Sequence, residues 1–241
     1  MRYLIVADIH SNLEAFTAVL RAAKDEGEIT EIWCLGDIIG YGPDPQACLH
    51  LLREHPHICV AGNHDMAAIG KIDTSDFNVA AALATNWTSQ HLSNEDIQYI
   101  ESLPLKKEVG DFTLVHGSPR GPIWEYVLSP VEALASLPFI FTDYCLFGHS
   151  HVPILFQFEG NDCYQIQLPS TLHPDKNRFM LNPGGVGQPR DRDPRASFVI
   201  YDSVSNSMKH YRVKYDISET QEKMIRLGLP PSLANRLSYG T

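Results

Sequence analysis

The sequence predicts an α/β protein built as a four-layer α/β/β/α sandwich, in which two mixed sheets pack face to face between outer helices. Three observations support this fold class. The N-terminal part alternates short apolar runs with segments of helical spacing, as βαβαβ units do. The C-terminal half is dominated by further strand-like runs, which require a second sheet. Five of the predicted strands end directly in side chains that can bind metals.

The N-terminal half begins with three strands separated by two helices. Apolar runs of strand length lie at residues 3–7, 32–36 and 58–61. The first helix is predicted over 12–24, where apolar residues have helical spacing and Ser11 or Asn12 can serve as the N-cap. The second helix is predicted over 46–53, after a break that contains prolines.

A pair of helices over 77–103 separates the two halves, and Ser93 and Asp96 have the spacing of a capping box. Further strands are predicted at residues 112–115, 144–148, 154–158, 164–168, 178–181, 197–201 and 208–215. The tail over 218–241 should form one or two short helices divided by prolines. Since no linker interrupts the pattern, we expect a single domain over 1–241 with a helical insertion and a helical tail.

Composition narrows the class of function. The chain has 241 residues and a formal net charge of -10, which argues against general nucleic-acid binding because that affinity depends on many Lys and Arg side chains. Its five cysteines are odd in number and lack metal-type spacing, so we expect reduced thiols and a cytoplasmic protein. No leader and no apolar run of membrane-spanning length is found in the sequence, so no membrane partner is expected.

The donor side chains at the strand ends carry oxygen and imidazole, without thiolate. They are Asp8 and His10, Asp37, Asn63, His116, and His149 and His151. Such donors suit Mn, Fe, Ni or Zn better than soft metals. Seven donors are too many for one tetrahedral ion and suit two divalent ions that share a carboxylate. A single histidine is more often structural, but five such elements in order predict a metal site.

The order Asp-x-His, Gly-Asp, Gly-Asn-His-Asp, His and Gly-His-x-His resembles the calcineurin-like metallophosphoesterases. The resemblance implies the same sandwich fold and two metal ions, with manganese the first candidate and Fe, Ni or Zn the others. It implies two ligand sets that share Asp37 as the bridge: Asp8, His10, Asp37 and His151 for one ion, and Asp37, Asn63, His116 and His149 for the other.

A metal-dependent phosphoesterase reaction follows from such a pair of ions. Two ions about 3.5–4 Å apart can hold a bridging hydroxide that attacks phosphorus in line with the leaving group. His64 is the candidate acid that protonates the leaving oxygen, because it follows a ligand without being one in the family pattern. Asp65 is expected to orient His64, with capping of the following helix as the alternative.

The sequence departs from the protein phosphatases of this family. Those enzymes continue Gly-Asp with an Asp that supports the acid histidine and an Arg that grips phosphate, whereas Gly40 and Tyr41 stand here. The chain instead resembles the small prokaryotic branch that is phosphodiesterase-like or related to diadenosine tetraphosphatases. That resemblance extends to residues 124–126 and 182–190, and favours phosphodiesters or nucleotide polyphosphates as substrates.

Candidate substrate-binding residues follow from the missing arginine. Arg120 and Arg190 could grip phosphate, or could pair with nearby acids. Trp124 and Tyr41 could stack a nucleobase, or could simply pack against the protein. The expected partner is a small phosphate ester, with nucleotides among the candidates, and the oligomeric state stays open.

Two other hypotheses for the function compete with a phosphodiesterase. A phosphomonoesterase or protein phosphatase would use the same metals, and rates on aryl monoesters and diesters would separate the two activities. A non-catalytic protein-binding scaffold with this fold could lose its acid histidine, whereas this sequence retains His64 and every predicted ligand.

Overall fold

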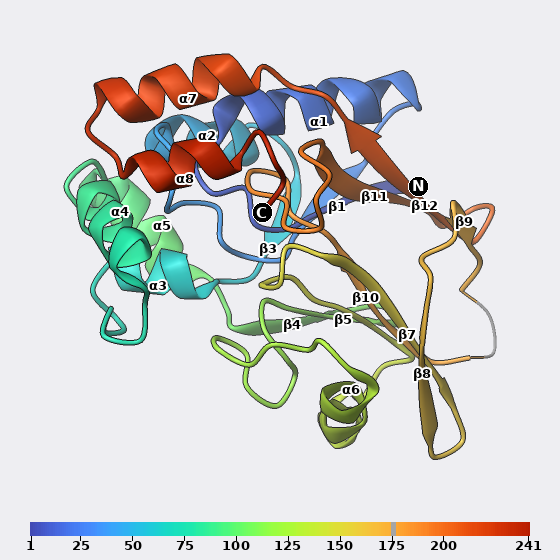
Figure 1. Cartoon of the computed structure of the whole chain (residues 1–241). Coiled ribbons are helices and arrows are strands. Elements are labelled where there is room, and N and C mark those ends of the chain that lie inside the picture. Colours follow the sequence, from blue (N-terminus) through green and yellow to red (C-terminus); the bar gives the residue numbers. More distant parts are fainter. Residues whose placement is uncertain (175–176) are drawn as a thin grey trace.

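The computed structural model describes residues 1–174 and 177–241, and its strands form two six-stranded sheets. Figure 1 shows the layers: helices α1, α2, α7 and α8 above the first sheet, the second sheet below it, and α6 beneath. The predicted four-layer α/β/β/α sandwich is confirmed. The organisation as a single domain over 1–241 stays a prediction.

The first sheet has the strand order β3-β2-β1-β11-β12-β9. Its strands are β1 (Arg2–Val6), β2 (Glu31–Cys34), β3 (His57–Cys59), β9 (Thr171–Leu172), β11 (Ala196–Asp202) and β12 (Ser207–Val213). The first three are parallel, with Leu4 opposite Ile32. The crossovers are α1 (Leu13–Asp25) and α2 (Pro45–Arg53), as the βαβαβ pattern predicts.

The second sheet has the strand order β4-β5-β6-β10-β7-β8. Its strands are β4 (Lys106–Val109), β5 (Phe112–Val115), β6 (Tyr144–Leu146), β7 (Pro153–Glu159), β8 (Asp162–Ile166) and β10 (Phe179–Pro183). The central strands β5, β6 and β10 run parallel. Strands β4 and β7 pair antiparallel with β5 and β10, and β8 pairs antiparallel with β7. Parallel strands bring their C-terminal ends to one edge, which is where chemistry collects in α/β folds.

Alternation along the strands builds the three core layers. On β1, Leu4 packs toward α1 and α2, while Ile5 belongs to the apolar layer between the two sheets. On the outer face of the second sheet, Phe156 and Met180 join the cluster that includes residues of α6 (Pro130–Ser136). Because these strands are buried on both faces, their sequences are continuous apolar runs.

The remaining helices are α3 (Asn63–Ala68), α4 (Val79–Ser89), α5 (Asn94–Ser102), α7 (Ile217–Arg226), α8 (Pro231–Arg236) and the short 3-10 helix η1 (Leu137–Phe139). Helices α3, α4 and α5 lie together at one side of the sheets (Figure 1). The predicted capping box is present, since Ser93 and Asp96 exchange hydrogen bonds at the start of α5. Apolar residues of α4, α7 and α8 share one cluster that also includes Tyr41.

Four elements were not anticipated: β4, β9, α6 and η1. Strand β4 is an edge strand of the sequence Lys-Lys-Glu-Val, which has no apolar run, and β9 has two residues. Within the described residues, every helix is too short or too polar to cross a membrane.

Candidate metal centre

The predicted ligands converge at the C-terminal ends of parallel strands of both sheets: β1, β2, β3, β5 and β6. All seven are buried, with at most 4 % of each residue exposed. Five of them have a left-handed backbone, with φ between 47° and 66°: Asp8, His10, Asp37, His149 and His151. Residues other than glycine rarely adopt this conformation, which costs roughly 1–3 kcal/mol each, so strain concentrates at this edge.

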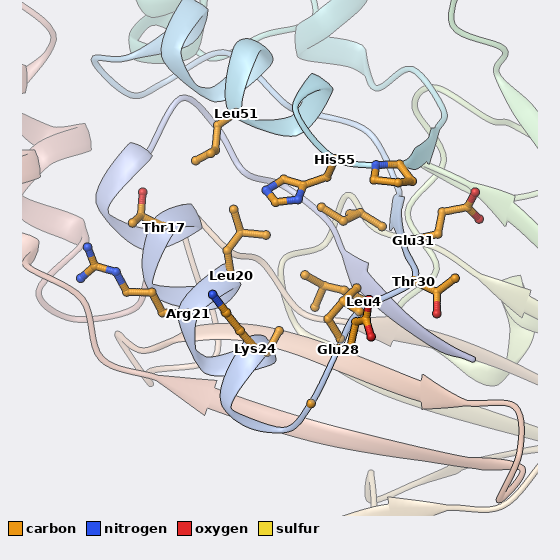
Figure 2. A pocket seen from close by; sticks show the side chains of 15 residues that line it. Leu4, Thr17, Leu20, Arg21, Lys24, Glu28, Thr30, Glu31, Leu51 and His55 are labelled. Carbon is orange, nitrogen blue, oxygen red and sulfur yellow. The ribbon is translucent and has the colours of Figure 1, made fainter.

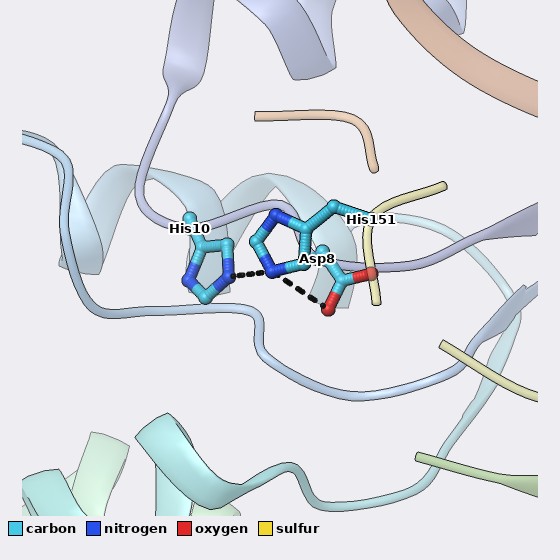
Figure 3. A group of neighbouring side chains, drawn as sticks. All are labelled: Asp8, His10 and His151. Carbon is cyan, nitrogen blue, oxygen red and sulfur yellow. Dashed lines mark hydrogen bonds and ion pairs between the residues drawn. The ribbon is translucent and has the colours of Figure 1, made fainter. Parts of the chain in front are cut away.

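One group of donors contains Asp8, His10 and His151 (Figure 3). The Nε2 atoms of His10 and His151 are 3.1 Å apart, and His151 Nε2 lies 3.6 Å from Asp8 Oδ1. Such spacing between ring nitrogens leaves each of them in reach of one shared ion.

A second group contains Asp37, His116 and His149. His116 Nε2 lies 3.2 Å from His149 Nδ1 and 3.0 Å from Asn63 Oδ1, so the asparagine joins this group. Asp37 Oδ2 lies 3.3 Å from His116 Nε2 and 3.6 Å from His10 Nε2. Asp37 therefore stands between the two groups, where a shared carboxylate is needed.

Backbone carbonyls orient three of the four histidines. The Nδ1 atoms of His10, His116 and His151 lie 3.1, 2.8 and 2.6 Å from the carbonyl oxygens of residues 39, 35 and 188. Such a bond fixes Nδ1 as the protonated nitrogen and leaves the Nε2 lone pair for a metal. In His149, Nδ1 is the nitrogen that faces the group, and its ring stacks on Tyr126 with centroids 3.9 Å apart.

The donor set fits divalent cations. Asp8 Oδ2 and Asp37 Oδ2 are buried and have no hydrogen-bond partner in the described part of the chain. Buried carboxylate oxygens are normally satisfied, so two unpartnered ones beside a histidine cluster indicate a cation site. Donors of oxygen and imidazole type suit Mn, Fe, Ni or Zn.

Burial and mutual charge shift the pKa values of these groups. Burial raises the pKa of Asp8 to about 7. Burial alone would also raise the pKa of Asp37, but the neighbouring charges of His116 and His64 bring it below the usual value. Burial opposes charge on His116, yet Asp37 raises its pKa to about 9. A divalent ion would displace that proton and neutralise the same acids.

Comparison with known proteins identifies the family. Residues 1–206 match the model of the calcineurin-like phosphoesterase superfamily domain. The chain belongs to this superfamily. It is a metal-dependent phosphoesterase, as the resemblance in sequence implied.

Relatives cover the whole length of this phosphoesterase. An uncharacterised protein of Methanocaldococcus jannaschii is 38% identical over 243 residues, which cover 98% of this chain and 97% of the relative. The crystal structure of a metallophosphoesterase from Sphaerobacter thermophilus superposes with a TM-score of 0.89 at 43% identity, covering 100% of this chain and 99% of the other. A hypothetical protein from Pyrococcus horikoshii shares the fold with a TM-score of 0.83 at 20% identity, covering 100% and 98%.

His64 lies beside the donors of the phosphoesterase. One of its ring nitrogens is within 4.8 Å of donor atoms of His10 and Asp37, and its amide donates to Asp37 Oδ1 at 2.9 Å. Burial lowers the pKa of His64 to about 4, so the free ring is neutral at pH 7. The negative charge of a bound phosphate ester would favour the protonated ring.

Asp65 does not orient His64, which corrects the expectation from the sequence. Its carboxylate accepts hydrogen bonds from the amides of Asp37 and Gly62 at 2.8 and 3.0 Å, and from the amide of Ile39 at 3.1 Å. The side chain thus caps the start of α3 and ties it to the loop that carries Asp37. This is the alternative that the sequence left open.

A cavity of about 80 Å³ opens beside the donors of the phosphoesterase. Its lining includes Tyr41, His64, Trp124 and Arg190, together with Asp37, Asn63, His149 and His151. Phe77 and Tyr126 also line it. Phe77 was not predicted as a site residue, because it precedes α4 and reaches the site only through tertiary packing.

Arg190 and Arg120 have different surroundings. The Arg190 guanidinium donates to Gln188 Oε1 at 2.9 Å and lies 3.3 Å from the Tyr41 hydroxyl, both neutral groups. Arg120 is bound by Glu125 and is absent from the lining of the cavity. Arg120 therefore pairs with an acid, which is the alternative that the sequence left open, and it does not reach the cavity.

A larger cavity of about 620 Å³ lies far from these donors, between α1, α2 and the start of β2 (Figure 2). Aliphatic side chains such as Leu20 and Leu51 line it together with polar and charged ones such as Lys24, and none of the predicted site residues reaches it. We assign the chemistry to the smaller cavity, since the unpartnered carboxylate oxygens and the histidines lie there.

Proposed function

We propose that this phosphoesterase hydrolyses phosphodiesters or nucleotide polyphosphates. Water adds to phosphorus, the bond from phosphorus to the leaving oxygen breaks, and His64 gives that oxygen its proton. One observation carries the proposal. Two groups of metal donors share Asp37, and they meet His64 and Arg190 around one small cavity.

The predicted ligands would hold two divalent ions, with manganese the first candidate. Such ions supply a water of lowered pKa and polarise the phosphoryl oxygens. Asp37 would be shared between the two sites, since its Oδ2 lies near both His10 and His116. The carbonyls behind the imidazoles hold the donors in place before the ions arrive.

Arg190 supports the binding of the transferred group. Its guanidinium has neutral hydrogen-bond partners, so its charge is available to an anion at the cavity. Two parallel hydrogen bonds to a phosphate would add orientation as well as attraction. The guanidinium also lies over the Tyr41 ring, with its Cζ 5.7 Å from the ring centroid.

The aromatic rim supports a nucleotide substrate. Trp124 is 37% exposed and packs against Phe77 in a T-shaped arrangement with 5.2 Å between ring centroids, so part of its ring is open to a base. The small cavity has room for a phosphoryl group, and the rest of a substrate would extend past this rim. We expect Trp124→Ala to lower activity on diadenosine tetraphosphate more than on a small aryl diester. Equal losses on the two substrates would count against stacking.

The deciding experiment compares substrates and metals side by side. Metal-stripped protein receives Mn, Ni, Fe, Zn or Mg and is tested on a bis-aryl phosphodiester, an aryl phosphomonoester and diadenosine tetraphosphate. Preference for the diester or the tetraphosphate supports the proposal. Preference for the monoester would replace it with a phosphomonoesterase, and inactivity of the two-metal protein on all esters would favour a scaffold.

The role of His64 has its own test. His64→Ala should retain two metals per chain, yet lose about 100-fold or more in turnover on esters with poor leaving groups. His55→Ala is the matched control, because His55 is an exposed histidine that lines only the larger, remote cavity. Unchanged turnover of His64→Ala on those esters would remove His64 as the acid.

We also propose a cytoplasmic location. The five cysteines are all free thiols, and four of them are buried. Free thiols persist in reducing compartments.

A further inference from the structure

The hydroxyl of Thr85 reaches the ring of His64 from helix α4. Its Oγ1 lies 3.4 Å from His64 Nδ1, and Thr85 is 1% exposed. Most buried hydroxyls have a hydrogen-bond partner. In the described part of the chain, the hydrogen bond recorded for this hydroxyl is the one to His64.

Other groups around the ring hold it in place without bonding Nδ1. The rings of Tyr41 and Phe77 lie 4.3 and 4.6 Å from the His64 ring, centroid to centroid. Gly40 lies against the ring, where a Cβ would come within 2.6 Å of Nδ1. Because its φ is +90°, position 40 also disfavours any side chain. Thr85 is thus the side chain whose polar atom meets Nδ1.

We propose that Thr85 is a positioning residue for His64, an inference that rests on the proposed role of His64 as the acid. The hydroxyl engages Nδ1 and so leaves Nε2 as the nitrogen that faces the leaving oxygen. The acid is the protonated ring, in which Nδ1–H donates to the hydroxyl and Nε2–H faces the leaving oxygen. Transfer of the Nε2 proton to the leaving oxygen leaves the neutral ring protonated on Nδ1 and still bound to the hydroxyl.

Helix α4, one of the two helices over residues 79–102, would thereby help to position the proposed acid. Helix α3 carries His64 and helix α4 carries Thr85, and the two helices pack against each other. Position 40 has no room for a side chain beside the ring, so helix α4 supplies the polar group that contacts Nδ1. A carboxylate would only accept a hydrogen bond, whereas the hydroxyl can do both.

The kinetic test uses isosteric variants. Thr85→Val removes the hydroxyl and retains the shape, and Thr85→Ser restores the hydroxyl. We expect Thr85→Val to lower turnover about tenfold on diesters with poor leaving groups and much less on activated aryl diesters, because only the former need the proton. Thr85→Ser should recover most of the loss.

Thr88→Val is the matched control. Thr88 lies one turn along the same helix, is fully buried, and its Oγ1 has no hydrogen-bond partner among the described residues. The same change of hydroxyl to methyl there should leave the dependence on leaving group unchanged. A similar loss in Thr88→Val would assign the effect to helix packing and overturn the inference.

A second readout reports the ring directly. Nitrogen-15 NMR of histidine-labelled, zinc-loaded protein identifies the His64 signal by its loss in His64→Ala. We expect the neutral ring to be protonated on Nδ1 in the natural protein, and to shift toward the tautomer protonated on Nε2 in Thr85→Val. An unchanged tautomer in Thr85→Val would overturn the inference even where activity falls.

Failure of the two proposals can be told apart. If His64→Ala leaves turnover on poor leaving groups unchanged, the proposed acid is wrong. If His64→Ala lowers that turnover but Thr85→Val does not, only the positioning role of Thr85 fails. If both proposals hold, adding Thr85→Val to His64→Ala should cause no further loss.

Discussion

Arg190 differs from the neighbouring arginines in the groups that surround its guanidinium. Neighbouring arginines are neutralised by acids: Arg195 by Asp193 and Arg212 by Asp191. Arg190 is instead held by Gln188 and the Tyr41 hydroxyl, and its Nε is buried without a partner within the described residues. A buried donor without a partner is costly, so we expect this guanidinium to gain hydrogen bonds when a phosphate binds.

Replacing Arg190 should therefore weaken substrate binding more than metal binding. Hydrogen bonds to charged groups contribute about 1.5–3 kcal/mol, so Arg190→Gln should lower kcat/KM about tenfold to a hundredfold, mostly through KM. Steady-state kinetics at saturating metal measure the effect. Arg195→Gln, which breaks only an exposed pair with Asp193, is the control and should change kcat/KM little. Equal effects of both changes would refute a specific role for Arg190.

Some site residues can be predicted from the sequence and others cannot. The predicted metal donors lie directly after strands, so a local pattern in the sequence is enough to predict that they lie close together. Arg120 and Arg190 could not be distinguished, because their partners Glu125 and Gln188 act through the folded loops. Thr85 lies within a helix, and no spacing in the sequence relates it to His64.

At the scale of elements, His210 on β12 belongs to a chain of hydrogen bonds that joins the two sheets. Its Nε2 lies 2.8 Å from Ser197 Oγ on β11, and that hydroxyl donates to the carbonyl of Pro183 on β10. Ser197 must therefore accept from His210, which requires a proton on Nε2. Burial lowers the pKa of His210 to about 4, so the ring stays neutral in the folded protein.

This arrangement predicts a loss of stability in mild acid. The unfolded chain takes up a proton at His210 near pH 6.5, whereas the folded chain does so only near pH 4. Between these values the unfolded state binds more protons, so the free energy of unfolding falls as the pH falls. We expect this group to contribute a loss of roughly 1–2 kcal/mol between pH 7 and pH 5.

Urea unfolding at pH 7 and pH 5 measures the effect. His210→Gln removes this group alone, so the variant should lose less stability than the natural chain over the same interval. The other histidines are the same in both proteins and cancel in the comparison. An identical pH dependence in the two proteins would contradict the prediction.

Elements differ in how far the sequence reveals them. Strands such as β1 and β5 are buried on both faces, and their apolar runs predicted them within a few residues. Edge strand β4 pairs on one side only and carries lysines. Its pairing with β5 therefore depends on the tertiary fold and not on a local apolar pattern. Helix α6 begins at a capping box formed by Ser129 and Glu132, a signal that the sequence contained and the prediction overlooked.

At the scale of the whole molecule, the donors couple metal binding to folding. Both sheets contribute ligands: Asp8 and Asp37 follow strands of the first, and His116 and His149 follow strands of the second. Asp8 and Asp37 are both buried at this site. Each has a carboxylate oxygen without a hydrogen-bond partner among the described residues. Bound ions would therefore hold the two sheets together as well as neutralise these acids.

Removing metal should lower the stability of the entire fold. A ligand present at 1,000 times its Kd stabilises the native state by about 4 kcal/mol, which corresponds to roughly 10 °C in Tm for a chain of this size. Calorimetry before and after chelation, with manganese restored, measures the change. Asp37→Asn, which weakens the shared ligand, should reduce the shift caused by manganese. The same Tm with and without metal would contradict this coupling.

The left-handed backbone at the donor positions has a consequence for the history of such a chain. At Asp8, His10, Asp37, His149 and His151, glycine would relieve the conformational cost, yet it would remove a donor each time. A lineage that folded without metal would drift toward glycine there, because each such change would favour folding of the metal-free chain. Random libraries screened for heat resistance in metal-free medium should therefore enrich inactive variants at these positions, so a search for more stable forms must screen for turnover as well.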